Sequence, residues 1–584
     1  MKIIMDVMTS KIEFTEHEEY LKETIHDEMH RNLGVRQEGY FYSPAYKAGY
    51  WDGIIDFYNA EDDTFHTGLV NQVESILGSL QGRYPFEFSI VDNRPDPFLS
   101  VEDLPNDIKL IGDDGGHITM RDYQYDAVVQ VVDKQVGIVE VATNGGKTEI
   151  AGAIIQQLLP YLERGERIAF FTNNTSIFTQ SIDRIEKRLG IKVGRYGAGH
   201  KDIQQVTFVM IPTINASLTA DPEKGLKLTG KNAVIKRIAK EIAPKFTKGV
   251  NQRLALRNLI KNHPTKSQVD KKVVEELEDI LYTCGTDNEI RFRIQGYQAE
   301  YQKIVESKNK KVYDKHNEAL AFLESVAVMI VDEAHHTSAD TWYQSLSKCT
   351  NAYYRVALTG SIDRKDHLLW QRLQAIFNKT IIKISNETLI NLGHSAKPKI
   401  TMFPIVSPQG HDESDYMIAR DACIVNNEYR NKLISQLTHK YYNEGKGVLI
   451  LVNIIEHGDN IVELLNDMGI PNAFIHGELP LDYREQQLDN MREGKLKVLI
   501  ATTIADEGVD ISGIDMLILG AGGKSLRQTL QRVGRALRKK KTGENVATII
   551  DFVDYTNKHL LNHSKERRKT YVQEKFEIND IQVN

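Results

Sequence analysis

One stretch, residues 137–159, constrains the fold of this chain more than any other. It begins with a short apolar run, residues 137–141, whose β-branched side chains predict a buried strand. Residues 151–159 have the apolar spacing of a helix, and a turn containing glycine separates the two elements. The start of a helix has unpaired N–H groups and a partial positive charge, so it favours an anion. The stretch therefore predicts an α/β domain with a phosphate site at this turn.

The turn ends in Gly145-Gly146-Lys147-Thr148. Glycine lets the backbone approach phosphate oxygens, the Lys147 ammonium can reach terminal phosphates, and the Thr148 hydroxyl can bind Mg²⁺. The match to the pattern G-x-x-x-x-G-K-[ST] is incomplete, because Val141 stands where the pattern has its first glycine. The alternative is an ordinary glycine turn with a lysine in solvent. The flanking strand and helix favour the phosphate site.

Composition excludes several classes of protein. A chain of 584 residues predicts several domains, and 41% hydrophobic with 26% charged residues is ordinary for a soluble globular protein. No apolar run approaches membrane-spanning length, and the first residues are unlike a signal peptide. The three cysteines are far apart and fit neither a zinc site nor a disulfide framework. We therefore expect a cytoplasmic protein.

The net charge of −7 hides a strongly basic segment. Residues 224–272 contain 14 Lys or Arg and only two acids, Glu241 and Asp270. This segment is therefore net +12, and the rest of the chain is about −19. Such a patch can bind phosphates, or it can be the solvated face of charged helices, and composition does not decide between these alternatives.

Residues 1–115 predict a small α+β domain, with a proline-rich linker at residues 92–105. Within this domain, residues 40–53 are unusually aromatic and include Lys47. Such aromatics can stack on nucleic-acid bases, or a hairpin can pack them as the core of the domain. Residue chemistry alone favours the hairpin core.

Further apolar runs at residues 168–172, 206–211, 327–331 and 354–358 predict a parallel sheet, because helical stretches separate them. The third run ends in Asp332-Glu333. One carboxylate at that position can bind Mg²⁺ through water, while the other positions or deprotonates an attacking water. About a hundred helical residues interrupt the sheet between residues 213 and 327, which is too long for a loop and predicts an inserted helical subdomain.

A second α/β unit begins near Pro398, with strands predicted at residues 447–452, 473–476 and 497–501. Residues 546–552 are predicted as the last strand, followed by a C-terminal helix or tail. In this half, Gln531, Arg535 and Arg538 share one helix face, because they are spaced i, i+4, i+7. Two guanidinium groups there can stabilise charge on a transferring phosphoryl group, although a basic helix with salt bridges is the simpler alternative.

Together these motifs resemble the superfamily 2 nucleic-acid helicases, most closely the UvsW-type phage recombination helicases. The resemblance covers about residues 118–570 without the insertion, and it rests on these pieces in the family's order: Arg121-Asp122-Tyr123-Gln124, ATNGGKT at 142–148, Phe171-Thr172-Asn173, Ile211-Pro212-Thr213, DEAH at 332–335, Leu358-Thr359-Gly360-Ser361, the junction at 389–400, His476-Gly477, the cluster at 502–510 and the cluster at 531–538. Residues 40–53 also resemble the family's N-terminal domain, which moves the expectation there towards DNA binding. Asn144 departs from the family pattern, and the insertion has no assigned counterpart.

The resemblance implies two tandem RecA-like motor domains at 116–390 and 391–584, with the insertion at about 221–325 and an N-terminal DNA-binding domain at 1–115. ATP and Mg²⁺ are the implied cofactors, and Gln124 is implied to recognise adenine. The implied ATP-binding residues are Arg121, Gln124, Thr143, Asn144, Gly145, Gly146, Lys147, Thr148, Gly508 and Asp510. The implied catalytic residues are Lys147, Asp332, Glu333, Gln531, Arg535 and Arg538, and the implied metal ligands are Thr148 and Asp332. The implied DNA contacts are Thr172, Asn173, Thr213, His476, Gly477 and Thr502.

The resemblance implies an ATP-dependent DNA helicase or translocase that unwinds or branch-migrates forked and recombination DNA. Its implied partners are forked, branched or single-stranded DNA and recombination or replication proteins, in the cytoplasm of a bacterial host if a phage encodes it. The alternatives are a double-stranded DNA translocase that does not separate strands, the motor subunit of a restriction system, an RNA helicase, and a binding protein with a degenerate ATP site. The retained lysine, carboxylates and arginines argue against the last.

Overall fold

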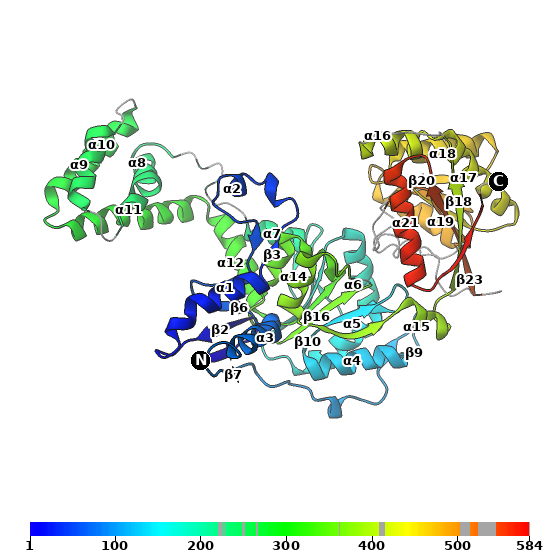
Figure 1. Ribbon diagram of the computed structural model, residues 1–584, viewed down its shortest axis with the longest axis horizontal. Helices are drawn as coiled ribbons and strands as arrows, with labels where there is room; N and C mark the ends of the chain where they lie inside the picture. The colour runs from blue at the N-terminus through cyan, green and yellow to red at the C-terminus, as the bar shows by residue number, and fades with distance from the viewer. Residues whose placement is uncertain are drawn as a thin grey trace. The chain divides into compact units, whose positions relative to one another are not determined.

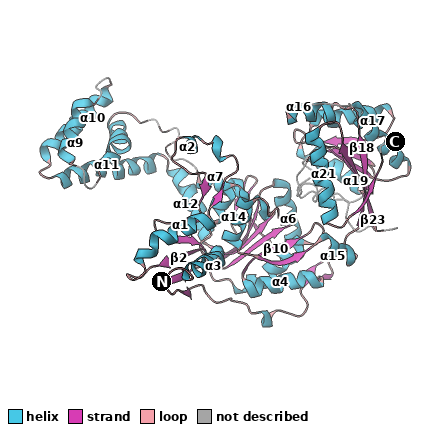
Figure 2. Ribbon diagram, in the orientation of Figure 1, coloured by secondary structure: helices cyan, strands magenta, loops and turns pink. Residues whose placement is uncertain are grey.

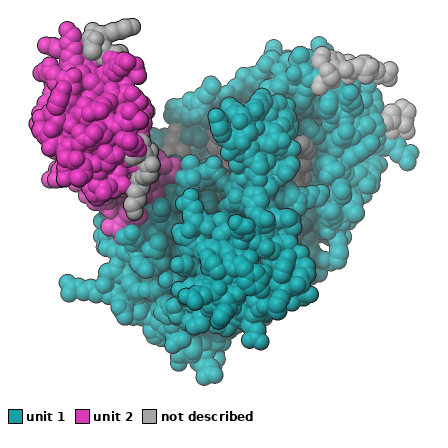
Figure 3. All heavy atoms as spheres, turned by 60° about the vertical axis from the view of Figure 1, so that its left-hand side comes forward, with its two compact units in different colours: residues 1–213, 323–584 teal, residues 214–322 magenta. Residues whose placement is uncertain are grey.

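The computed structural model describes residues 1–219, 223, 226, 228–247, 251–263, 267–360, 362–407, 415–502, 514–523 and 545–582. The chain forms two compact units (Figure 3). Unit 1 comprises Met1–Thr213 and Leu323–Asn584, and unit 2 comprises Ile214–Phe322.

Unit 1 begins with a small mixed sheet in the order β5-β6-β2-β1-β7. These strands are β5 (Tyr58–Asn59), β6 (Thr64–His66), β2 (Thr9–Glu13), β1 (Lys2–Met5) and β7 (Ser89–Asp92). Helices α1 (Lys22–Leu33) and α3 (Val70–Gln81) bury one apolar face each in the same core, which includes Ile3, Met29 and Leu77. This segment is α+β, as predicted.

The aromatic run does not form a core hairpin, so that preferred interpretation is wrong. Strands β3 (Val35–Arg36) and β4 (Ile54–Ile55) pair, and between them lie a 3₁₀ turn, Tyr40–Tyr42, and the short helix α2 (Pro44–Lys47). Tyr42 is 73% exposed and Tyr50 is 90% exposed. The rings pack on one another instead, with Tyr40 edge-on to both Phe41 and Tyr46.

The next sheet of unit 1 has eight strands (Figure 1). In order across the sheet they are β13 (His200–Asp202), β12 (Gly194–Gly197), β14 (Val206–Met210), β11 (Arg167–Thr172), β15 (Val326–Asp332), β16 (Tyr354–Thr359), β10 (Val136–Val141) and β17 (Thr380–Ile384). All pairs are parallel except β12 with β13. The five predicted strands are confirmed as β10, β11, β14, β15 and β16.

Continuous apolar runs made these strands predictable, because β10, β14, β15 and β16 are buried along their whole length. The helices of this part are α4 (Asp122–Lys134), α5 (Lys147–Leu158), α6 (Thr175–Leu189), α7 (Ile211–Leu218), α13 (Asp340–Leu346), α14 (His367–Phe377) and α15 (Asn386–Asn391). A two-stranded ribbon, β8 (Lys109–Ile111) with β9 (His117–Thr119), precedes α4. Figure 2 shows helices packed beside the strands of both large sheets.

The N-terminal sheet packs closely on the eight-stranded part. A Cβ atom on Gly68 would lie 2.1 Å from the Gln374 carbonyl oxygen and 2.5 Å from that of Ala375, both in α14. Ala375 is itself a member of the N-terminal core. The buried guanidinium of Arg355 donates to the carbonyl of Val7 and, at 2.8 Å, to that of Ile376. The two parts therefore share a core and a hydrogen bond from the Arg355 side chain to the N-terminal backbone.

The last sheet of unit 1 has seven strands, all parallel. In order they are β20 (Ala473–Ile475), β21 (Val498–Ala501), β19 (Val448–Leu451), β22 (Met516–Leu519), β23 (Val546–Asp554), β18 (Lys397–Ile405) and β24 (Glu577–Asp580). The accompanying helices are α16 (Tyr416–Arg420), α17 (Glu428–Asn443), α18 (Ile455–Asp467), α19 (Leu481–Arg492) and α21 (Lys558–Gln573). The parallel α/β class is confirmed for both large sheets.

Residues 546–552 form a strand, β23, as predicted, but the prediction that this strand is the last one is wrong. Helix α21 follows β23, and β24 then pairs with β18 at the edge of the sheet. Strand β24 is polar and largely exposed, so it lacks the apolar run that marks a central strand.

Unit 2 is helical, as predicted. Its helices are α8 (Lys231–Arg237), continued by a π-helical turn at Ile238–Ile242, then α9 (Gln252–Asn262), α10 (Gln268–Thr283), α11 (Asp287–Lys308) and α12 (Lys310–Glu324), whose last residues reach unit 1. Asn309 ends α11 and separates it from α12. Leu256, Leu277 and Ile294 bury their side chains in a core of the unit's own. Among the described residues of the whole chain, no helix is long and apolar enough to cross a membrane.

Candidate nucleotide site and nucleic-acid interface

The predicted phosphate loop joins β10 to α5 and has the backbone of a tight anion-binding turn. Gly145 N–H donates to the Ala142 carbonyl at 3.0 Å, and Gly146, with φ +80°, caps the start of α5. A Cβ on Gly145 would lie 2.3 Å from Val141 Cγ1, and one on Gly146 would lie 2.3 Å from Gln124 Nε2. Both positions therefore require glycine, and the first turn of α5 follows them directly.

Asn144, which departs from the family pattern, has φ +71°. Only glycine adopts this left-handed conformation without strain, and asparagine tolerates it better than most other residues. The departure is therefore compatible with the backbone that the loop needs.

The start of α4 holds the loop from one side. The Gln124 amide donates to the Gly145 carbonyl at 3.0 Å, and its Oε1 accepts from Arg121 N–H at 3.0 Å. Tyr123 OH donates to the same Gly145 carbonyl at 3.0 Å and accepts from the Arg121 guanidinium at 2.8 Å. In this structure Gln124 therefore clamps the phosphate loop. Its predicted contact with adenine stays a prediction, and the clamp by Tyr123 was not predicted.

Lys147, at the start of α5, and the two predicted carboxylates, at the end of β15, come together. Lys147 Nζ donates to Glu333 Oε1 at 2.7 Å, and Glu333 N–H donates to Asp332 Oδ1 at 2.9 Å. Asp332 ends β15, and β16 pairs in parallel with both β15 and β10. All three residues therefore lie at the C-terminal edge of the sheet. Glu333 has φ +49°, a strained backbone for a residue with a side chain and common at functional sites.

The two adjacent carboxylates have opposite pKa shifts. Burial raises the pKa of Asp332 to about 6, against the lowering effect of the Lys147 charge. Burial also acts to raise the pKa of Glu333, but the Lys147 charge and a hydrogen bond from His335 outweigh it and hold that pKa well below its ordinary value. The pair is thus divided into a carboxyl that takes up a proton readily and a carboxylate that stays ionised.

A polar chain connects Glu333 to the next strand. His335 Nδ1 lies 3.2 Å from Glu333 Oε2 and 3.4 Å from Thr359 Oγ1. Thr359 ends β16 and is completely buried, and a Cβ on the following Gly360 would lie 3.7 Å from Lys147 Nζ. A change in the position or charge of the Glu333 side chain can therefore act on Thr359 through His335. Thr359 lies at the end of the neighbouring strand, β16.

The residues fit ATP and Mg²⁺. The loop has N–H donors and a glycine-only cradle for phosphates, and Thr148 and Asp332 offer the oxygen ligands that Mg²⁺ prefers. Thr143 and Thr148 are both partly exposed in this loop. Among the described residues no cluster of three or more His, Cys, Asp or Glu could hold a metal. A Mg²⁺ site built from one or two protein ligands and phosphates needs no such cluster.

The predicted nucleic-acid residues lie at the ends of other strands. Thr172 ends β11 and Thr213 follows β14, its neighbour, while His476 follows β20 and Thr502 follows β21, its neighbour. Thr172 and Thr502 are buried, whereas Gly477 is exposed. The nucleotide and nucleic-acid candidates thus follow different β-strands, and the contact of buried Thr172 and Thr502 with nucleic acid stays a prediction.

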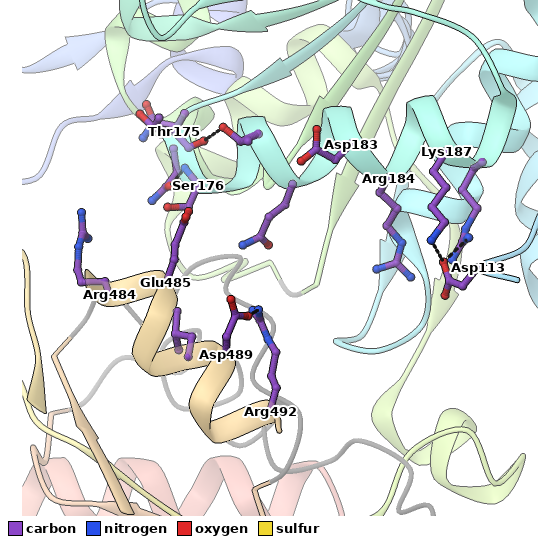
Figure 4. A pocket seen from close by; sticks show the side chains of 16 residues that line it. Asp113, Thr175, Ser176, Asp183, Arg184, Lys187, Arg484, Glu485, Asp489 and Arg492 are labelled. Carbon is purple, nitrogen blue, oxygen red and sulfur yellow. Dashed lines mark hydrogen bonds and ion pairs between the residues drawn. The ribbon is translucent and has the colours of Figure 1, made fainter. Parts of the chain in front are cut away.

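Asn173 lines a pocket of about 1310 Å³ (Figure 4). Its walls include Thr175, Arg184 and Lys187 from α6 and Arg484 and Arg492 from α19. Arg492 donates to Asp489 at 2.6 Å, and Lys187 pairs with Asp113 at 3.2 Å, so part of the positive charge is neutralised within the pocket.

Several predicted residues lie outside the described part of the chain. They are Gly508, Asp510, Gln531, Arg535 and Arg538, and their roles remain predictions.

Two buried arginines, which were not predicted from the sequence, donate hydrogen bonds to carbonyl groups of residues 520–523. Buried Arg430 forms an ion pair with Asp554 and donates to the Gly520 carbonyl at 2.9 Å. Buried Arg567 pairs with Asp551 at 2.9 Å and donates to the Gly523 carbonyl at 2.8 Å. Isolated arginines in helices carry no motif that could have indicated this.

Two family models match the chain. The description "Type III restriction enzyme, res subunit" matches residues 117–236 and 229–364, and "Helicase conserved C-terminal domain" matches residues 429–540. The first match contains the phosphate loop and Asp332-Glu333, and the second contains residues 502–510 and the whole cluster at 531–538. The chain belongs to the superfamily 2 helicases. Enzymes of this superfamily are ATP-dependent helicases.

Individual relatives of this helicase are distant. It is 26% identical over 270 residues, 44% of this chain and 49% of that protein, to a protein described as an ATP-dependent RNA helicase of Acanthamoeba polyphaga mimivirus. It is 26% identical over 247 residues, 41% of this chain and 38% of that protein, to one described as the DNA 3′–5′ helicase Rad25 of Halobacterium salinarum. It is 29% identical over 216 residues, 36% of this chain and 45% of that protein, to helicase D10 of Escherichia phage T5. The alignments thus span about half or less of these relatives' own length.

Solved structures resemble the helicase at low sequence identity. The crystal structure of T4 UvsW is matched over 100% of this chain and 99% of that chain, with 16% identity and a TM-score of 0.41. The structure of the DUF1998 helicase MrfA bound to DNA is matched over 81% of this chain and 51% of that chain, with 12% identity and a TM-score of 0.47. Family membership therefore rests on the two sequence models.

Proposed function

We propose that this helicase is a Mg²⁺- and ATP-dependent DNA motor that unwinds or branch-migrates forked and recombining DNA. The observation that supports it most is the ion pair of Lys147 with Glu333, formed beside buried Asp332 and next to the loop that contains Gly145 and Gly146. A lysine, a metal-binding carboxylate and a second carboxylate are the groups that phosphoryl transfer to water requires.

ATP supplies a phosphoanhydride bond whose hydrolysis releases free energy. The N–H groups at the start of α5 and the Lys147 ammonium hold the phosphates, and Thr148 and Asp332 hold Mg²⁺. Binding requires Lys147 to leave Glu333 for a phosphate oxygen. The loss of that neighbouring charge raises the pKa of Glu333, because the Lys147 charge is what holds it low. Glu333 then becomes the stronger base towards an attacking water.

The Glu333–His335–Thr359 chain carries the change at the nucleotide to the end of β16. Arg535 and Arg538 act from the second motor domain, so hydrolysis requires that domain to close on the first. Closure and opening move the predicted contacts Thr172, Asn173, Thr213, His476, Gly477 and Thr502 along the phosphate backbone. Such contacts are independent of sequence.

DNA is proposed as the track on two grounds. The motif order resembles the UvsW-type recombination helicases, and the exposed rings of Tyr42 and Tyr50 leave the N-terminal domain with aromatic surface that can stack on bases. The relatives' names include both DNA and RNA helicases, so an RNA track is the second candidate. A double-stranded DNA translocase that does not separate strands is the third.

The proposed domains are the N-terminal DNA-binding domain at 1–115, motor domain 1 at 116–390 with its insertion at about 221–325, and motor domain 2 at 391–584. We also propose a cytoplasmic location and recombination or replication proteins as partners.

Strand displacement on matched forked DNA and RNA substrates tests the proposal. DNA unwinding that requires ATP supports it, and unwinding of RNA alone would replace DNA as the track. ATP hydrolysis stimulated by duplex DNA without any displaced strand would indicate the translocase.

A further inference from the structure

Unit 2 carries a group of lysines that have no acidic partner in the described part of the chain. We propose that this group, Lys236, Lys261, Lys271 and Lys272, binds the phosphate backbone of double-stranded DNA. We call it the lysine cluster. The inference deepens the proposed function, because it gives the DNA motor a second contact that needs no ATP.

The cluster lies at one end of the helical unit. Lys261 is in the last turn of α9, and Lys271 and Lys272 are in the first turns of α10, on the other side of the connection between these helices (Figure 1). Lys236 precedes Arg237, whose guanidinium pairs with Asp270 at the start of α10 at 3.1 Å. That ion pair brings α8 against the same end of α10. Lys261, Lys271 and Lys272 are exposed, and Lys236 is half-buried.

The acidic residues of the basic segment form ion pairs with residues outside the lysine cluster. Of the two in residues 224–272, Glu241 pairs with Arg237 at 3.1 Å and Asp270 pairs with the same arginine. The neighbouring Glu223 pairs with Lys240 at 2.7 Å. Among the described residues, no ion pair is formed by any of the four cluster lysines. The cluster lysines therefore carry charges that no acid in the described part of the chain neutralises, and duplex binding distinguishes a phosphate contact from a solvated face.

The position of the lysines also costs stability. The start of a helix has a partial positive charge and favours acids, yet Lys271 and Lys272 are in the opening turns of α10. Of the acids of α10, Asp270 lies in the first turn and is paired with Arg237, whereas Glu275, Glu276, Glu278 and Asp279 lie further along the helix. Four like charges at one end repel one another, and an anion bound there removes that repulsion. Because acids lie further along α10, a polyanion is attracted to the end of the helix that carries Lys271 and Lys272.

The absence of stacking groups at the cluster favours duplex over single-stranded DNA. The exposed large aromatics of the described part of unit 2 are Tyr282, 84% exposed, and Phe292, 66% exposed. They lie at the other end of α10 and at the start of α11. Single-strand binding sites combine cations with aromatic rings, whereas a duplex with stacked bases offers its phosphates to cations alone.

The test compares two full-length variants with the same change in charge. The first replaces the cluster, Lys236→Gln, Lys261→Gln, Lys271→Gln and Lys272→Gln. The second replaces four exposed lysines of α11 and α12, Lys303→Gln, Lys308→Gln, Lys310→Gln and Lys311→Gln. The binding of a labelled duplex and a labelled single strand is measured without nucleotide over a series of salt concentrations. Thermal melting and DNA-free ATPase activity are measured in parallel.

We expect the cluster variant to lose about tenfold or more in duplex affinity at low salt. Its slope of log affinity against log salt should flatten by roughly 2 to 4, since each lost phosphate contact removes about 0.9. The control variant should stay within about twofold, and melting and DNA-free ATPase should be unchanged in both variants. The binding assay contains no ATP, so a wild-type protein without ATPase activity would refute the motor and leave this result standing.

Three results would overturn the inference. They are unchanged duplex affinity in the cluster variant, an equal loss in both variants, and a loss confined to single-stranded DNA. Retained duplex binding together with loss of an acidic protein ligand would assign the cluster to that ligand instead.

Discussion

At the scale of single residues, Lys147 and Glu333 form an ion pair in the candidate nucleotide site. Their ion pair of 2.7 Å occupies the lysine that should bind phosphate and lowers the pKa of the carboxylate that should act as base. In the proposed function ATP binding breaks the pair, so Lys147 becomes available to phosphate as the pKa of Glu333 rises. The arrangement couples occupancy of the site to the strength of its base.

Replacing Glu333 separates binding from hydrolysis. With Glu333→Gln, ATP should bind at least as well as in the wild type, because Lys147 no longer has a competing carboxylate, while turnover should fall by about 10²- to 10⁴-fold. Lys147→Ala should lose ATP binding and hydrolysis together. Nucleotide titrations and single-turnover hydrolysis measure the two effects, and near-normal turnover in Glu333→Gln would refute its role as base.

Asn144 provides a test of the phosphate loop's backbone. With φ +71°, the position accepts glycine freely, so Asn144→Gly should keep ATP affinity within about threefold. Asn144→Val places a β-branched residue in the same conformation at a cost of about 1–2 kcal/mol, which is roughly a 5- to 30-fold loss in affinity. Equal affinities for the valine and glycine variants would show that the loop takes another conformation when it binds ATP.

At the scale of secondary-structure elements, α18 packs against α17 through a buried histidine. His457 is 1% exposed and its Nε2 lies 3.0 Å from Asn431 Oδ1. Burial, together with the charge of Arg430, lowers the pKa of His457 to about 3. The folded protein therefore keeps this ring neutral, whereas the unfolded chain takes up a proton below about pH 6.5.

This histidine predicts a loss of stability as pH falls. Because the unfolded state binds more protons, the stability of this part should decrease between pH 6.5 and 3, by about 1.4 kcal/mol per pH unit. His457→Gln keeps an amide donor for Asn431 and removes the titration, so its loss between pH 7 and 5 should be about 2 kcal/mol smaller. Urea unfolding at both pH values measures this, with exposed His439→Gln on α17 as the control. Identical pH dependence of wild type and His457→Gln would contradict the assignment.

The elements also show where sequence reasoning succeeds. The central strands β10, β14, β15 and β16 were predictable, because a strand buried on both faces must be a continuous apolar run. The edge strand β24 was not, since half of its environment is solvent. Residues 40–53 were misjudged for a related reason, because aromatic composition does not say whether rings pack inward or on one another at the surface.

At the scale of the whole molecule, the N-terminal sheet and the eight-stranded part share a core. Gly68 touches the backbone of α14, and Arg355 donates to the Val7 carbonyl. No motif predicted this docking, because it depends on a glycine and an arginine far apart in the chain. The consequence is that aromatic surface at residues 40–53 is fixed to the domain that carries Lys147, Asp332 and Glu333.

The sequence predicted some residues of the candidate site and not others. Motif order predicted Lys147, Asp332 and Glu333, and the structure places them together. The clamp of Gly145 by Tyr123 and Gln124 could not be predicted, because it depends on how α4 packs on the loop. The burial of Thr172 and Thr502 could not be predicted either, because the sequence at the end of a strand does not show whether its last side chain faces solvent.

The measurement that tests the central claim most directly is steady-state ATPase activity of the full chain, alone and with forked DNA, single-stranded DNA and a matched RNA. The account predicts Mg²⁺-dependent hydrolysis that forked DNA stimulates strongly and that Glu333→Gln abolishes. Hydrolysis stimulated by RNA alone would contradict the DNA assignment. The absence of hydrolysis under every condition would contradict the claim that Lys147, Asp332 and Glu333 form an ATP-hydrolysing site.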